Sequence, residues 1–67
     1  MPYVHIDWVK GNDQSKKDEL AKRVTSAVTE VTGIPGEAIW VVFQEVEDTS
    51  WYVGARTVQA IRAESKE

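Results

Sequence analysis

The sequence contains no cysteine, only one histidine and no long apolar run. The lack of cysteine excludes disulfides and thiolate metal sites, and a single histidine argues against a zinc site. No apolar stretch approaches the roughly 20 residues of a membrane-spanning helix, and no basic segment followed by an apolar one marks a signal peptide. We therefore expect a cytoplasmic protein with no metal, no cofactor and no membrane partner.

A surplus of positive charge is also missing. Eight basic residues are interleaved with eleven acidic ones, for a net charge of −3, so we expect no nucleic-acid partner. The 67 residues predict one domain over residues 1–67, and a chain this short buries only about 60% of its unfolded surface. Because disulfides and metal are not expected, oligomerisation is the remaining source of stability.

The first half of the chain predicts a strand followed by an amphipathic helix. Apolar and other residues alternate through residues 2–9, which is the period of a strand. Asn12 or Asp13 can cap the helix that follows, Gly33 suits its left-handed end, and Pro35 prevents its continuation. The apolar residues recur at helical spacing and predict the buried face of this helix: Leu20, Val24, Ala27, Val28 and Val31.

The second half predicts another strand at residues 38–46, apolar at every position from Ile39 to Phe43. Such a strand is usually buried on both faces. Two strands joined by a long helix form a right-handed crossover, which implies a parallel pair and an α+β fold of β-α-β type. The helix can cover only one face of a two-stranded sheet, so we expect the subunit to oligomerise through the sheet.

The remaining residues predict smaller elements. Residues 51–53 indicate a short edge strand or hairpin arm, and residues 54–67 have weak helical character around Val58 and Ile61. We expect residues 58–67 to be a mobile or interface tail.

Pro2 is the residue with the clearest potential for chemistry. Small penultimate residues permit removal of Met1, which would leave a free prolyl amine. An α-amino group has an ordinary pKa of about 7.7–8.0, and burial among apolar groups lowers that pKa. An amine poised near neutrality can take up and return a proton. Taken alone, a proline at position 2 is weak evidence for catalysis, because it also fits the start of a strand.

Four segments together resemble the 4-oxalocrotonate tautomerase family, in order and spacing: MPYVHIDWVKG, KKDELAKRVTSAVTEVTG, IPGEAIWVVFQEV and SWYVG. The resemblance covers about residues 2–58. It implies a β-α-β subunit, usually assembled as a hexamer from three dimers, with the amino-terminal proline as catalytic base. That proline matches Pro2. It also implies a pocket built across subunits.

The sequence departs from the family at two positions where the family has arginines that bind the substrate's carboxylate and polarise its carbonyl. These positions are Asn12 and Trp40 here. Asparagine lacks the bidentate charge of arginine, and tryptophan offers area and one N–H donor. The family's aromatic wall residue matches Trp51, and Trp8 lies near the expected pocket. Each tryptophan could instead be a core or interface residue.

Arg56 and Lys10 are candidates to replace a lost arginine, although both could be ordinary surface charges. We therefore expect a cofactor-free isomerase that tautomerises a small 2-oxo acid, with Pro2 as base and then acid. The substrate contacts would come from Trp8, Asn12, Trp40, Trp51 and Arg56. One alternative is a hydratase or dehalogenase of an unsaturated acid, for which Asp7 could activate water. Another is an oligomeric binding module that has lost activity.

Overall fold

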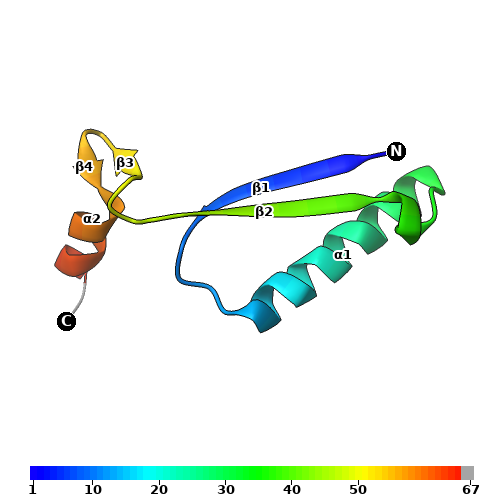
Figure 1. Cartoon of the computed structure of the whole chain (residues 1–67), viewed down its shortest axis with the longest axis horizontal. Coiled ribbons are helices and arrows are strands. Elements are labelled where there is room, and N and C mark those ends of the chain that lie inside the picture. Colours follow the sequence, from blue (N-terminus) through cyan, green and yellow to red (C-terminus); the bar gives the residue numbers. More distant parts are fainter. Residues whose placement is uncertain (66–67) are drawn as a thin grey trace.

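The computed structural model describes residues 1–65 (Figure 1). Two long strands and a long helix form the first part of the chain, and a hairpin with a short helix forms the second. The elements are β1 (Tyr3–Val9), α1 (Gln14–Thr32), the 3₁₀ helix η1 (Gly36–Ala38), β2 (Trp40–Val46), β3 (Tyr52–Val53), β4 (Arg56–Thr57) and α2 (Val58–Ser65).

β1 and β2 pair in parallel, as the sequence predicted, with Tyr3 opposite Trp40 and Val9 opposite Val46. The crossover between them is α1, which lies along the sheet (Figure 1). The chain is thus a β-α-β subunit, called the βαβ unit below (residues 3–46), with a long helix on one face of a parallel pair.

Local chemistry sets the ends of α1. The Asp13 carboxylate accepts a hydrogen bond from the Lys16 backbone N–H at 3.2 Å, so Asp13 is the N-cap. Gly33 has a φ of 78°, and its N–H donates to the Thr29 carbonyl at 2.8 Å. A left-handed residue at this point favours glycine because a Cβ would be strained there. The predictions for both helix ends are confirmed.

The predicted start of the second strand was wrong by two residues. Ala38 belongs to η1, where its N–H donates to the Pro35 carbonyl at 3.0 Å. Pro35 therefore does more than end the preceding helix, because its carbonyl accepts the bond that closes this short turn. Pro2 similarly precedes β1, and its carbonyl accepts the Trp40 N–H at 3.0 Å.

The two faces of the β1–β2 sheet differ in their cover. The face toward α1 carries half-buried side chains: Val4, Ile6, Trp8, Val41, Phe43 and Glu45. On the opposite face, called the open face below, the side chains are exposed: Tyr3, His5, Asp7, Trp40, Val42 and Gln44. Trp40 and Val42 are 56% and 39% exposed, so the apolar centre of β2 is covered on one side only.

The predicted buried face of α1 is confirmed in part. Leu20, Val24 and Val28 are half-buried, and Lys17 on the same side bonds to Glu45 of β2 at 3.3 Å. Ala27 and Val31, however, are exposed, Val31 by 86%. Ala27 lies on the flank of the face. Val31 lies in the last turn of α1, whose 19 residues span about 28 Å, which is longer than the roughly 23 Å spanned by the seven residues of a strand.

Residues 47–65 form a separate unit, called the arm below. β3 and β4 pair antiparallel, which confirms the predicted hairpin arm, and the weak helical pattern around Val58 and Ile61 is helix α2. The turn between the strands has positive φ at Gly54 (58°) and Ala55 (68°), as a two-residue type I′ turn requires. The predicted mobile tail falls partly on residues 66 and 67, which lie outside the described residues.

The subunit is open for its size. Its accessible surface is 5031 Å², whereas a folded monomer of this mass exposes about 4,300 Å². Its radius of gyration is 15.4 Å, against about 11 Å for a compact domain of this length. Within residues 1–65, Ile39 alone among apolar residues is buried, and it is still 8% exposed. A single copy therefore leaves much of its apolar surface in water.

Candidate active site

Pro2 and Trp40 lie together at the start of the parallel pair. The hydrogen bond from the Trp40 N–H to the Pro2 carbonyl, 3.0 Å long, holds the two backbones side by side. Pro2 is half-buried, whereas Met1 is 80% exposed. While Met1 is attached, the Pro2 nitrogen is part of a peptide bond and has no basicity. Removal of this exposed residue would place a secondary amine beside Trp40.

Trp8 lies near the other end of β1, on the face that α1 covers. Its ring packs against Phe43 with 4.9 Å between ring centroids. The Trp8 Nε1–H is buried and has no partner. A buried donor left unpaired costs about 1–3 kcal/mol. Within one subunit Trp8 is therefore a packing residue that still lacks an acceptor.

Asn12 lies in the loop between β1 and α1, half-buried, next to Gly11. Gly11 has a φ of 141°, a conformation that L side chains rarely adopt. The loop can therefore turn sharply after β1, which sets the position of Asn12.

Trp51 and Arg56 belong to the arm. Trp51 is half-buried just before β3, and its carbonyl accepts the Val58 N–H at 2.8 Å. The Arg56 guanidinium forms an ion pair with Glu64 of α2. Each of the chain's three arginines has such a carboxylate partner: Arg23 pairs with Glu19, Arg56 with Glu64 and Arg62 with Asp48.

The predicted site residues do not meet in one subunit. Pro2 and Trp40 lie at the start of the sheet, whereas Trp8 lies six residues along the strand from Pro2, about 20 Å away. The β1–α1 loop, which contains Asn12, and the arm lie at that far end (Figure 1). An open hollow of about 530 Å³ in the arm is lined by Asp48, Gln59, Arg62, Ala63 and Ser65, none of which was a predicted site residue.

A hydrogen-bonded chain on the open face was not foreseen as a unit. The Tyr3 hydroxyl lies 3.0 Å from His5 Nδ1, and His5 Nε2 lies 2.8 Å from Asp7 Oδ1. A carboxylate only accepts, so Nε2 donates to Asp7; in the neutral imidazole Nδ1 is then the acceptor for the Tyr3 hydroxyl. The two-residue period of the strand was the available signal, because it places these three residues on one face.

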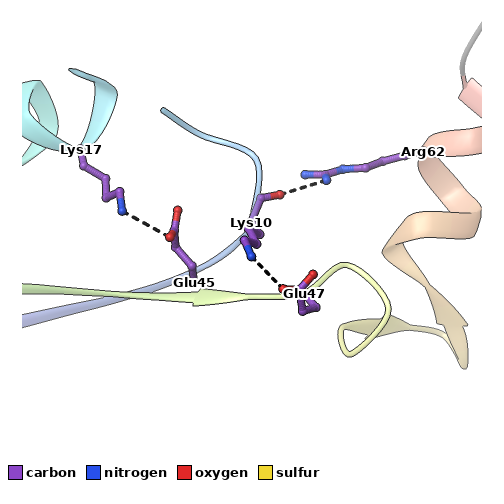
Figure 2. Close-up of polar contacts among 5 residues, drawn as sticks. All are labelled: Lys10, Lys17, Glu45, Glu47 and Arg62. Atoms are coloured by element: carbon purple, nitrogen blue, oxygen red, sulfur yellow. Dashed lines mark hydrogen bonds and ion pairs between the residues drawn. The ribbon is translucent and has the colours of Figure 1, made fainter. Parts of the chain in front are cut away.

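Polar contacts around Lys10 join the arm to the βαβ unit (Figure 2). The Lys10 ammonium lies 2.9 Å from Glu47, and the Arg62 guanidinium donates to the Lys10 carbonyl at 3.3 Å. The hydrogen bond to Glu47 and the charge of that carboxylate raise the pKa of Lys10. Lys10 thus has a carboxylate partner of its own. No group of three possible metal ligands gathers within residues 1–65.

Known proteins resemble this chain, which is a small β-α-β subunit with a proline before its first strand. A sequence model described as "Tautomerase enzyme" matches residues 2–61. A "Probable tautomerase" of Bacillus cereus is 39% identical over 56 residues, which cover 84% of this chain and 92% of the relative. Another, from Lactiplantibacillus plantarum, is 43% identical over 54 residues, covering 81% and 84%. The chain belongs to the tautomerase family.

Solved structures agree on the fold. TomN, described as a 4-oxalocrotonate tautomerase homologue in the tomaymycin biosynthetic pathway, superposes with a TM-score of 0.89 at 29% identity, over 97% of this chain and all of that one. A heterohexamer 4-oxalocrotonate tautomerase from Chloroflexus aurantiacus gives 0.84 at 27% identity, over 92% and 100%. Both matches include the arm as well as the βαβ unit.

In the described part of the chain, no helix is both long and apolar enough to cross a bilayer. The cytoplasmic location stays a prediction.

Proposed function

We propose that the chain, once Met1 is removed, is a cofactor-independent tautomerase of a small 2-oxo acid with Pro2 as its base. The observation that supports this most directly is Pro2 at the start of β1, beside Trp40, in a chain of this family. The Pro2 amine takes a proton from the carbon next to the carbonyl, which leaves an enolate, and the Pro2 ammonium then gives that proton to the oxygen to form the enol. In the reverse direction Pro2 takes the proton from the enol oxygen and gives it to the carbon.

A second copy of the chain completes the proposed site. Two βαβ units that pair edge to edge about a two-fold axis run antiparallel across the new edge. The start of one pair then lies beside the end of the other, so the Pro2 end of one copy approaches the β1–α1 loop of the next, which carries Asn12. Donors near Trp8 or Asn12 could then face the enolate oxygen, where fixed N–H groups stabilise developing charge. The exposed Trp40 and Val42 supply apolar surface for further contacts. We propose a homohexamer.

The charge of the site favours a substrate with one carboxylate and an aromatic group, such as the enol of phenylpyruvate. Asn12 and Trp40 offer no cation, and all three arginines already pair with carboxylates. Trp40 and Trp51 offer aromatic area instead. Arg56 is the residue proposed to bind the carboxylate of the substrate. To do so, its guanidinium must leave Glu64 and pair with the substrate instead.

The test is a pair of samples that differ only at the N-terminus, with mass spectrometry to establish whether Met1 is present. We expect processed protein to ketonise phenylpyruvate enol, and protein that retains Met1 to lose about 10²–10⁴-fold in rate, the usual size of a general acid–base contribution. The lower pH limb should report an apparent pKa below the roughly 7.7–8.0 of a free α-amino group. Equal turnover by both samples would exclude Pro2 as the base.

A hydratase of an unsaturated acid is the second candidate, because the Asp7 carboxylate is held by His5 on the open face. Asp7→Asn distinguishes the two reactions: it should abolish addition of water to an unsaturated acid but leave Pro2-dependent ketonisation intact. If processed protein does neither reaction yet binds the acids, the chain is a binding module.

A further inference from the structure

The arm is internally well connected but has few polar ties to the rest of the subunit. At the start of α2, the Val58 N–H donates to the Trp51 carbonyl at 2.8 Å and the Gln59 N–H to the Asp48 carbonyl at 3.1 Å. The Thr57 hydroxyl accepts the Ala60 N–H at 3.1 Å. These bonds fix the hairpin, the turn before it and α2 to one another, so the arm moves as a unit.

Within residues 1–65, the hydrogen bonds and ion pairs from the arm to the βαβ unit all reach one residue, Lys10. Glu47 bonds to its ammonium and Arg62 to its carbonyl (Figure 2). The Glu47 contact adds little to the covalent connection, because Glu47 directly follows β2. The Arg62 contact joins positions 52 residues apart and is therefore the long-range polar tie between the arm and the βαβ unit.

The Arg62 guanidinium lies against the loop that carries Asn12. Its Nη1 atom is 3.3 Å from the Lys10 carbonyl oxygen and 3.7 Å from the point where a Cβ on Gly11 would stand. The same nitrogen is 3.7 Å from Asp48. One nitrogen of the guanidinium therefore contacts the β1–α1 loop and the turn before β3 at once, the first through a hydrogen bond and the second through a longer ion pair.

We propose that Arg62 is a positioning residue: it holds the arm, with Trp51 and Arg56, in a fixed place relative to the Asn12 loop. This inference rests on the proposed function, since those residues are the proposed substrate contacts. Arg62 acts through the loop and the arm and does not touch the reacting atoms. Its loss should therefore weaken substrate binding and leave the chemistry of Pro2 unchanged.

The experiment compares Arg62→Met with Arg23→Met in processed full-length protein. Arg23 also pairs with a glutamate and is exposed, but it lies on α1 away from the loop and the arm. We expect Arg62→Met to speed amide hydrogen exchange in residues 10–13 and 47–65 and to raise KM for phenylpyruvate enol about three- to tenfold, the loss expected for one partly exposed charged hydrogen bond. The kcat should stay within about twofold, since a contact remote from the reacting atoms contributes to binding. Arg23→Met should change neither quantity.

Arg62→Lys keeps the positive charge and an N–H donor on a shorter side chain. Compared with Arg62→Met, it should restore part of the exchange protection and bring KM part of the way back to the wild-type value. Unchanged exchange in Arg62→Met would overturn the proposal, and so would faster exchange with an unchanged KM. A fall in kcat with KM unchanged would also overturn it. If processed wild-type protein turns over no 2-oxo acid, the proposed function fails, while the exchange comparison still decides whether Arg62 ties the arm to the loop.

Discussion

The βαβ unit and the arm differ in how their backbones are stabilised. In the βαβ unit each left-handed position is a glycine, Gly11 or Gly33, and seven residues of each strand pair in register. In the arm the hairpin strands have two residues each, and Ala55 has a φ of 68°. The βαβ unit is therefore specified mainly by its own chain. The arm depends more on its contacts with the rest of the subunit, such as the hydrogen bond from Arg62 to the Lys10 carbonyl.

The same contrast separates the two faces of the β1–β2 sheet. The face under α1 is half-buried within one subunit, whereas the open face leaves Trp40 and Val42 in water. Burying such side chains is worth about 25 cal/mol per Å² of apolar surface. Assembly would supply that stabilisation.

The largest expected effect is a loss of stability on substitution in α1, and it shows which residues of this helix are buried within one subunit. Val28→Asp places an unpaired charge between α1 and the sheet and should destabilise the fold by more than about 2 kcal/mol. Val31→Asp, at an 86% exposed position, should leave the helix content of the subunit unchanged. Urea unfolding followed by circular dichroism measures both. Equal losses in the two variants would show that Val31 is buried by another copy, and light scattering would reveal the dissociation.

Val28 and Val31 also show how much of the structure could be predicted from the sequence. The spacing of apolar residues predicted the strands and the helix, the residue types at its ends predicted the helix caps, and the long helical crossover predicted the parallel pairing. All of these depend on local sequence. The same spacing placed Val31 in the core because a helical repeat contains no information on where the sheet ends.

Family resemblance grouped Pro2, Trp40, Asn12 and Trp51. In one subunit Pro2 and Trp40 lie at one end of the β1–β2 sheet. Asn12 and Trp51 follow the strands at the other end, because strand length keeps the two ends apart.

A second prediction concerns charge at the two ends of the βαβ unit. Asn12→Arg with Trp40→Arg should shift the ratio of kcat/KM toward a dicarboxylate dienol and away from phenylpyruvate enol. Each charge-assisted carboxylate contact is worth on the order of 1.5–3 kcal/mol, or roughly ten- to a hundredfold. Steady-state kinetics on both substrates measures the shift. Native protein that already prefers the dicarboxylate would contradict our account of Asn12 and Trp40 and point to Arg56 or Lys10.

A smaller effect is expected in the arm. Ala55→Gly removes the cost of a Cβ at positive φ, about 1–2 kcal/mol, and adds about 0.4–1 kcal/mol of chain entropy to the unfolded state. The hairpin should gain up to about 1 kcal/mol, seen as slower amide exchange in residues 52–57. Gly54→Ala is the matched control, since a Cβ there would meet open space and only the backbone cost applies. It should speed exchange in the same residues, and no change in either variant would argue against the type I′ turn.

The smallest expected effect lies at the exposed N-cap of α1. Hydrogen bonds from the Ser15 hydroxyl and the Lys16 N–H hold the pKa of Asp13 below 3.8. A lowered folded-state pKa means that the carboxylate stabilises the helix fully above pH 3.8 and loses that contribution as pH falls through the folded pKa. Asp13→Ala should lower Tm slightly at neutral pH, whereas Asp13→Asn should keep most of the cap, because asparagine also accepts the Lys16 N–H. On acidification the Tm advantage of the wild-type protein over Asp13→Asn should shrink below pH 3.8. Thermal unfolding at neutral and acidic pH measures this difference in Tm. A Tm difference between wild-type protein and Asp13→Asn that is independent of pH would show that the carboxylate does not cap α1.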